Sequence, residues 1–184
     1  MTKNRTQSLG DVVPDWTLPD LNGTDHGLMP ALADKKGAVV VFWSSVCSHC
    51  VRYDDYLNAL TQRHPGLALL VVASRQSEDA SVLRAAVAER HLEFPVLRDA
   101  DRLVAQTWFV EQTPRVFLVD AACRLRYRGA IDNFKYAEDP EHQSYLELAI
   151  EALLTGKPID RAETPSFGCP IKSVYYDMPR PLGD

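Results

Sequence analysis

Two cysteines lie close together in the chain, at a spacing that suits redox chemistry. Cys47 and Cys50 enclose Ser48 and His49, and the apolar run 38–43 precedes them. This order predicts a buried strand that leads into a helix whose first turn holds both thiols. Unpaired N–H groups at a helix N-terminus favour a thiolate over a thiol. We therefore predict that Cys47 attacks a disulfide and that Cys50 resolves the resulting mixed disulfide.

The residue between the thiols and the rest of the sequence bear on this interpretation. A protonated imidazole near a sulfur lowers its pKa, so His49 is predicted to tune the acidity of Cys47. A structural zinc site normally needs four ligands, and the sequence has neither a second C-x-x-C pair nor a His-x-x-x-His partner. Inert buried thiols are the other alternative, because free cysteine is often buried. We favour the redox pair over both.

Length and composition limit the class of protein. The chain has 184 residues, of which 46% are apolar, and a net charge of −5 without a long basic run. These values fit one domain with extensions and give no support for a nucleic-acid surface. No apolar run approaches the ~20 residues that a membrane span needs. Residues 1–8 lack the apolar stretch of a secretory signal, so we expect a cytoplasmic protein, or a periplasmic one if a signal segment precedes the sequence given.

Strand and helix patterns alternate along the chain. They predict an α/β fold with a central mixed sheet flanked by helices, an N-terminal hairpin and an extended C-terminal tail. We assign residues 1–155 to one domain, which includes the hairpin. The proline-rich tail 156–184 is predicted to pack on that domain. The expected elements are a hairpin within 13–27, strands at 39–43, 67–73, 94–97, 116–119 and 125–129, and helices at 51–63, 79–90, 101–109 and 144–154.

The order of motifs resembles the thioredoxin fold. Phe42 and Trp43 precede the cysteine pair, and Thr113-Pro114 precedes a predicted strand. The resemblance implies that Pro114 is a cis proline facing the dithiol, and that Thr113 and Pro114 position the substrate backbone. More narrowly, segments 113–120, 127–132 and 167–172 resemble the redoxin branch that contains alkyl hydroperoxide reductase and thiol-specific antioxidant proteins. Within that branch they resemble a bacterial peroxiredoxin-like subgroup.

The sequence departs from these families at two places. The peroxidase pattern Pro-x-x-x-Thr-x-x-Cys, aligned on Cys50, places Trp43 at the proline and Cys47 at the threonine. Peroxidase geometry is therefore not expected. Val41 stands where thioredoxins carry a buried aspartate that accepts the proton of the resolving cysteine. Asp54 is a substitute within reach of Cys50 in sequence, but we expect an exposed helix carboxylate there, since Asp is rarely buried.

Several further residues have two interpretations each. Trp43 either covers the disulfide and shapes a substrate groove or packs in the core, and the two roles can coexist. Arg115 either steers an acidic substrate or is a solvated charge. For Cys169 we expect a buried anchor of the tail, with a third redox thiol as the alternative. Cys123, in a predicted turn, is expected to be incidental. The remaining histidines, without ligand partners nearby in sequence, are expected at the surface: His26, His64, His91 and His142.

Together these features predict a thiol:disulfide oxidoreductase that uses the Cys47/Cys50 couple. Its substrates would be protein disulfides or small thiols, and an upstream thiol reductant would supply electrons. No cofactor or metal is required. Two alternatives stay open: a thiol-dependent peroxidase, and a metal-binding or copper-handling protein with the thioredoxin fold. The sequence has no His-rich or Met-rich tract, which counts against metal handling.

Overall fold

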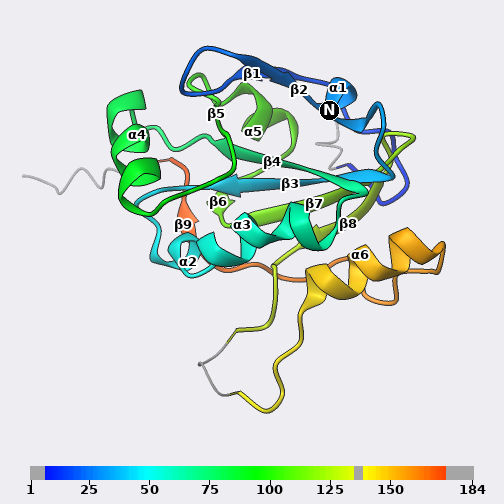
Figure 1. Cartoon of the computed structure of the whole chain (residues 1–184). Coiled ribbons are helices and arrows are strands. Elements are labelled where there is room, and N and C mark those ends of the chain that lie inside the picture. The colour runs from blue at the N-terminus through cyan, green and yellow to red at the C-terminus, as the bar shows by residue number, and fades with distance from the viewer. Residues whose placement is uncertain (1–6, 135–138, 173–184) are drawn as a thin grey trace, which may run out of the picture.

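The computed structural model describes residues 7–134 and 139–172. Its centre is a five-stranded mixed sheet with the order β5-β4-β3-β7-β8 (Figure 1). β3, β4 and β5 are parallel, whereas β7 runs antiparallel to β3 and β8 antiparallel to β7. The predicted α/β fold class with a mixed sheet is therefore confirmed. The strands are β5 (Val96–Arg98), β4 (Leu67–Ala73), β3 (Gly37–Trp43), β7 (Arg115–Asp120) and β8 (Leu125–Gly129).

The central strand β3 is buried on both faces, as its unbroken apolar sequence requires. Alternate side chains enter two separate hydrophobic clusters, because successive residues of a strand point to opposite faces. Val39, Val41 and Trp43 join the cluster that also holds both active-site cysteine candidates. Phe42 joins the other cluster together with Ala38 and Val40. Trp43 therefore lies on the face of the sheet where the cysteines are found.

Helices cover both faces of the sheet (Figure 1). α3 (Asp54–Arg63), α4 (Ala80–Glu89) and α6 (Tyr145–Thr155) contribute side chains to the cluster with the cysteines. α1 (Leu28–Leu32) and α5 (Leu103–Thr107) contribute to the other cluster. The predicted N-terminal hairpin is confirmed as β1 (Thr17–Pro19) paired with β2 (Asp25–Gly27). The short helix α1 follows the hairpin directly and was not predicted.

The predicted helix 51–63 is wrong at its start. Two helices replace it, α2 (Ser48–Val51) and α3, and Tyr53 between them has φ −104° and ψ 4°. The break lets Asp54 turn inward at the first turn of α3, where a carboxylate is favoured by the helix dipole. The predicted helix 101–109 is also shorter, because the Asp99 carboxylate accepts from the first N–H groups of α5, those of Val104 and Ala105.

The tail crosses the end of the sheet where the cysteines lie. β9 (Cys169–Pro170) pairs antiparallel with β6 (Gln112–Thr113), just before β7. Next to β9, Ile171 is 1% exposed and packs in the cluster of α1 and α5, on the opposite face of the sheet from the cysteines. The extended tail was predicted; its last part, 173–184, lies outside the described residues. Within the described ranges no helix is long and apolar enough to cross a membrane.

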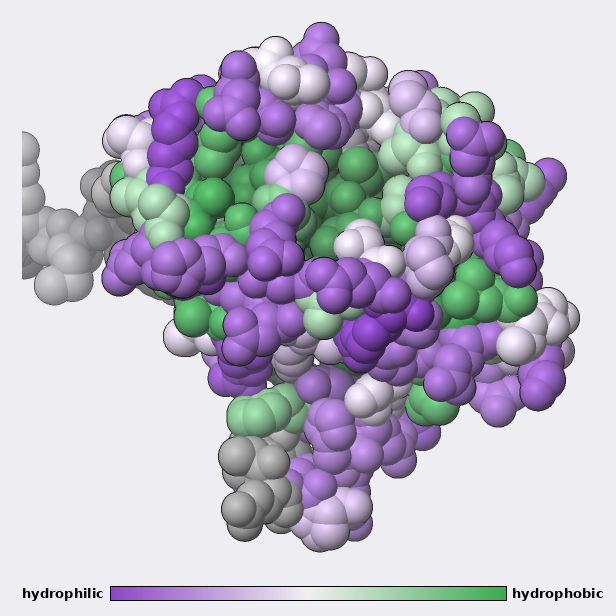
Figure 2. All heavy atoms as spheres, in the orientation of Figure 1, coloured by the Kyte–Doolittle hydropathy of each residue, from purple (hydrophilic) through white to green (hydrophobic). Residues whose placement is uncertain are grey.

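The surface on the side shown in Figure 2 is mostly hydrophilic, and hydrophobic side chains show in a recess of its upper half. Among the residues described, single large apolar side chains are exposed near the cysteine turn, namely Val46, Val51, Phe134 and Phe167.

Candidate redox site

The two predicted redox cysteines follow the carboxyl end of β3. Cys47 is the N-cap of the one-turn helix α2, and Cys50 lies inside it. The N–H groups of Cys50 and Val51 both donate to the Cys47 carbonyl, at 2.8 and 3.1 Å, which fixes the turn. Both cysteine side chains are 0% exposed and both are free thiols. The predicted C-x-x-C geometry, at the end of a buried strand and the start of a helix, is therefore present.

A third cysteine lies beside this pair. Cys169 stands opposite Thr113 in the β6–β9 ladder, and the protonated Cys47 thiol donates to the Thr113 carbonyl at 3.3 Å. Cys169 packs against the buried cluster that contains Cys47 and Cys50. Cys169 is only partly buried, unlike the other two. Cys47 and Cys169 thus both lie beside Thr113.

Hydrogen bonds make Cys47 acidic. The Cys50 thiol, as the largest influence, and the thiol and backbone N–H of Cys169 lower the pKa of Cys47 to about 4, against the opposing effect of burial. The cause is donation to the charged form, which stabilises a thiolate. Burial raises the pKa of Cys50, and the neighbouring Cys47 raises it further. Burial and Cys47 also raise the pKa of Cys169. Cys47 is therefore the most acidic of these three thiols.

The segment facing the cysteines matches the resemblance to the thioredoxin fold. The Thr113–Pro114 peptide bond is cis. Thr113 is 1% exposed, and its backbone is occupied by the tail strand β9. Pro114 lines a groove of about 470 Å³ next to the cysteine turn. The side chains around this groove include His49, Arg52, Phe134 and Phe167.

The structure gives different surroundings to the two residues predicted to assist the dithiol. His49 is exposed and lines the groove, so its proposed effect on Cys47 stays a prediction. Trp43 is 0% exposed, and its ring contacts Phe94 and the Arg90 guanidinium. Its burial supports the packing interpretation, and in this structure it has no surface to offer a substrate.

The expectation of an exposed Asp54 is wrong. Its carboxylate is 5% exposed, accepts a hydrogen bond from Trp43 Nε1 at 3.0 Å and forms an ion pair with Arg90 at 3.2 Å. Burial raises its pKa, and Trp43 and Arg90 oppose that shift. The break between α2 and α3, which sequence periodicity did not indicate, turns this side chain inward. Asp54 therefore fixes Trp43 behind the cysteine turn.

Other residues named from the sequence also differ from the simplest expectations. Arg115 is half-buried rather than solvated, and its guanidinium donates to Ser166 Oγ of the tail at 2.9 Å. Cys123 lies in the predicted turn but is 5% exposed, in the cluster on the other face of the sheet. Three of the histidines have acidic partners: His26 with Asp20, His64 with Glu147 and His142 with Asp132.

Sequence reasoning missed one residue that supports the cysteine turn. The Glu78 carboxylate accepts hydrogen bonds from both the backbone N–H and the hydroxyl of Ser45. Glu78 is 6% exposed and follows β4, 33 residues after Ser45. Because the contact joins the ends of two parallel strands, no local pattern signals it. The carboxylate ties down the loop that leads from β3 to Cys47.

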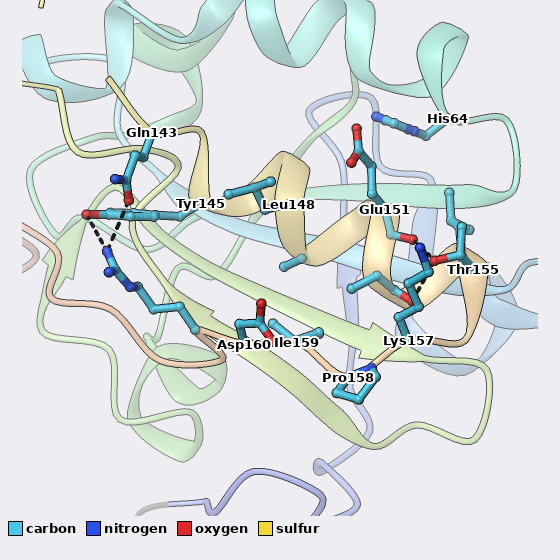
Figure 3. A pocket seen from close by; sticks show the side chains of 14 residues that line it. His64, Gln143, Tyr145, Leu148, Glu151, Thr155, Lys157, Pro158, Ile159 and Asp160 are labelled. Atoms are coloured by element: carbon cyan, nitrogen blue, oxygen red, sulfur yellow. Dashed lines mark hydrogen bonds between the residues drawn. The ribbon is translucent and has the colours of Figure 1, made fainter. Parts of the chain in front are cut away.

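A second pocket shares Tyr145 with the groove beside the cysteine turn. It has a volume of about 620 Å³ and lies along α6 and the segment after it, with Tyr145, Glu151 and Lys157 among its lining residues (Figure 3). None of the cysteines lines it. No group of three metal-ligating side chains in a metal-binding arrangement occurs within residues 7–134 and 139–172. The candidate site is therefore the turn with the cysteines.

Comparison with known proteins decides the family. The family model described as AhpC/TSA matches residues 9–128, which include both cysteines of the pair and Pro114. The chain belongs to the AhpC/TSA family. This AhpC/TSA member is 27% identical to the thiol-disulfide oxidoreductase ResA of Geobacillus thermodenitrificans over 119 residues, which are 65% of this chain and 67% of that protein. The predicted redoxin branch is thus confirmed. The predicted enzyme class, thiol:disulfide oxidoreductase, is the class named for ResA.

Solved structures place the AhpC/TSA chain among thioredoxin-like folds. A hypothetical protein from Sinorhizobium meliloti is 28% identical, with a TM-score of 0.81, and the match covers 91% of this chain and 95% of that one. A putative thiol:disulfide interchange protein DsbE from Chlorobium tepidum is 21% identical, with a TM-score of 0.66, over 80% of this chain and 99% of that one. The second match bears on the fold alone.

Proposed function

We propose that the protein is a thiol:disulfide oxidoreductase whose working couple is Cys47 and Cys50. The observation that carries this proposal is the position of the two free thiols at the start of α2, where the Cys47 sulfur lies 3.3 Å from the Thr113 carbonyl, directly before the cis bond to Pro114. The opposite acidity of the two sulfurs supports it. Cys47, with its pKa lowered to about 4, is a thiolate near neutral pH, whereas the pKa of Cys50 is raised. A low pKa makes Cys47 both a nucleophile and a good leaving group. Relatives named thiol-disulfide oxidoreductase support the same class.

The reaction follows from this arrangement. The Cys47 thiolate attacks one sulfur of a disulfide, forms a mixed disulfide and releases the other sulfur as a thiolate, which takes up a proton. In the mixed disulfide Cys47 no longer carries a negative charge. The electrostatic repulsion from Cys47, one of the causes that raise the pKa of Cys50, therefore disappears. Cys50 then loses its proton more readily and attacks the Cys47 sulfur. The second substrate thiolate leaves, and the Cys47–Cys50 disulfide remains.

Partners and compartment belong to this proposal as well. We propose protein disulfides or small thiols as substrates, a thiol reductant upstream, and the cytoplasm as the compartment. The groove beside His49 and Pro114 supports a peptide-sized substrate, because it adjoins the cysteine turn and combines Arg52 with apolar side chains. Phe167, 78% exposed, lies on its rim.

The test compares two reactions of the reduced protein. We expect it to reduce insulin disulfides in the presence of a thiol donor, and to consume hydrogen peroxide no faster than an ordinary acidic thiol. Cys47→Ser and Cys50→Ser should both abolish catalytic insulin reduction, whereas Cys123→Ser, across the sheet, should keep it. Fast peroxide turnover that requires Cys50 but not Cys47 would instead establish the peroxidase alternative.

A further inference from the structure

The nucleophile of the proposed couple is buried, and the chain's own tail pairs with the segment beside it. Cys47 and Cys50 are both 0% exposed. β9 pairs with β6 at Thr113, whose carbonyl faces the Cys47 sulfur at 3.3 Å. Cys169 is the residue of β9 that stands opposite Thr113, and it packs against the cluster that holds Cys47 and Cys50. A disulfide arriving from solvent therefore meets Cys169, which is partly exposed, before it can meet Cys47.

The tail is seated closely over the site. A Cβ added at Gly168 would come within 1.8 Å of the Thr113 carbonyl oxygen, so only glycine allows this approach. Ile171 anchors the far side of β9, with its N–H donating to the Glu111 carbonyl at 2.9 Å. Arg75 Nη1 donates to the Pro170 carbonyl at 3.2 Å. Ile171 thus anchors the tail independently of Cys169, whose expected anchoring role stays a prediction.

From this geometry we infer that Cys169 is a third redox thiol, which relays exchange between external disulfides and the buried Cys47. The inference rests on the proposed function, because the Cys47/Cys50 couple is the store of electrons that the relay serves. Its substrates are disulfides whose sulfurs cannot reach Cys47 while β9 is in place. The site thus has three cysteines with separate tasks: Cys169 exchanges with the substrate, Cys47 exchanges with Cys169, and Cys50 resolves.

The relay balances in three steps. The Cys169 thiol loses its proton to solvent and attacks an external disulfide, which forms a mixed disulfide and releases one substrate thiolate. The Cys47 thiolate next attacks the Cys169 sulfur; the Cys47–Cys169 bond forms and the second substrate thiolate leaves. Both released thiolates take up protons. Cys50 then attacks Cys47, and its proton passes to the Cys169 thiolate that leaves. Two electrons have moved from the Cys47/Cys50 pair to the substrate.

The test traps the middle step. In the Cys50→Ser variant the last step is blocked, so a slight excess of 5,5′-dithiobis(2-nitrobenzoate) should release a second thionitrobenzoate per site as the Cys47–Cys169 disulfide closes. Closure should be about 1,000-fold faster than exchange between molecules at micromolar protein, because tethered groups reach millimolar effective concentrations. Peptide mass mapping should find the Cys47–Cys169 crosslink. Cys50→Ser/Cys169→Ser is the matched control and should lack the second release.

A stable thionitrobenzoate adduct in Cys50→Ser, without a Cys47–Cys169 crosslink, would overturn the inference. The turnover of Cys169→Ser separates this failure from failure of the proposed function. We expect this variant to form the Cys47–Cys50 disulfide but to reduce insulin about tenfold more slowly, since the tethered thiol is lost. Unchanged turnover in Cys169→Ser would refute the relay and leave the dithiol couple intact. Circular dichroism checks that Cys169→Ser retains the fold. A second variant, Cys169→Ala, must show the same turnover as Cys169→Ser.

Discussion

Replacing Ile171 with alanine should release the tail from the site without unfolding the domain. Ile171 is 1% exposed, follows β9 directly and packs in the cluster to which α1 and α5 contribute. Truncating a buried isoleucine to alanine costs about 2 to 5 kcal/mol, and we take about 3 kcal/mol for this site. Since β6 and β9 each contain only two residues, local detachment of the tail should absorb this cost.

That cost converts into accessibility of the nucleophile. With a tenfold change for every ~1.4 kcal/mol, about 3 kcal/mol raises the detached population roughly 100-fold. The rate at which iodoacetamide alkylates Cys47 should rise by the same factor, provided that reclosure is faster than alkylation. Mass mapping of quenched samples measures the rate for each cysteine separately. Cys123, which lies on the opposite face of the sheet from the cysteine turn and in the cluster that also holds Ile171, reports on any opening that extends beyond the tail.

The matched control is Leu148→Ala, because Leu148 is 58% exposed on α6 and lies outside the buried cluster that holds Ile171. It should leave the Cys47 rate unchanged. The reasoning is refuted if Ile171→Ala remains folded and Cys47 is alkylated no faster than in the unaltered protein. A parallel rise at Cys123 would equally refute it, since the substitution would then have destabilised the whole domain.

Three further predictions follow from single contacts. Asp54→Asn should lower the free energy of unfolding by about 2 kcal/mol, because it leaves the Arg90 charge unpaired near Trp43. Asp55→Asn, on the exposed side of α3, is the control and should change this free energy little. Urea denaturation measures both variants. Below pH 4 Cys47 should be protonated, because its pKa is lowered to about 4. The thiolate should stabilise the reduced protein increasingly as pH rises from about 4 towards the ordinary thiol pKa. If the difference in unfolding free energy between the unaltered protein and Cys47→Ser stays constant over this interval, the lowered pKa is contradicted. Gly168→Ala should push β9 off Thr113 and speed alkylation of Cys47. Gly66→Ala, whose new Cβ would meet nothing closer than 3.8 Å, is the control and should leave the rate unchanged. Equal alkylation rates in the two variants would show that the tail tolerates a side chain at residue 168.

The sheet and the cysteine turn could be predicted because their signals are local. The apolar run of β3, the turn residues between β7 and β8, and the spacing of Cys47 and Cys50 are each contained in a few consecutive residues. The cis bond before Pro114 came from resemblance alone, since most X-Pro bonds are trans. The predicted strands 67–73 and 125–129 match β4 and β8 residue for residue, whereas the helix predicted from residue 51 begins only at Asp54 as α3.

The contacts that set the chemistry of the site join distant parts of the chain, and these could not be predicted. Glu78 reaches Ser45 across the ends of β3 and β4, and Asp54 turns inward to Trp43. A third contact of this kind is the pairing of β6 with β9, which places Cys169 opposite Thr113, beside Cys47. A two-residue strand carries almost no periodic signal, so the sequence left the role of Cys169 open.

The most direct test of the central claim is the identity of the disulfide that forms at equilibrium. The full-length protein would be equilibrated in glutathione buffers of graded potential, quenched with acid, alkylated and mapped by mass spectrometry. We expect a two-electron transition, in which the ratio of oxidised to reduced protein changes tenfold per ~30 mV and Cys47–Cys50 is the disulfide that accumulates. Accumulation of a different disulfide, or retention of both Cys47 and Cys50 as thiols across the whole series, would contradict it.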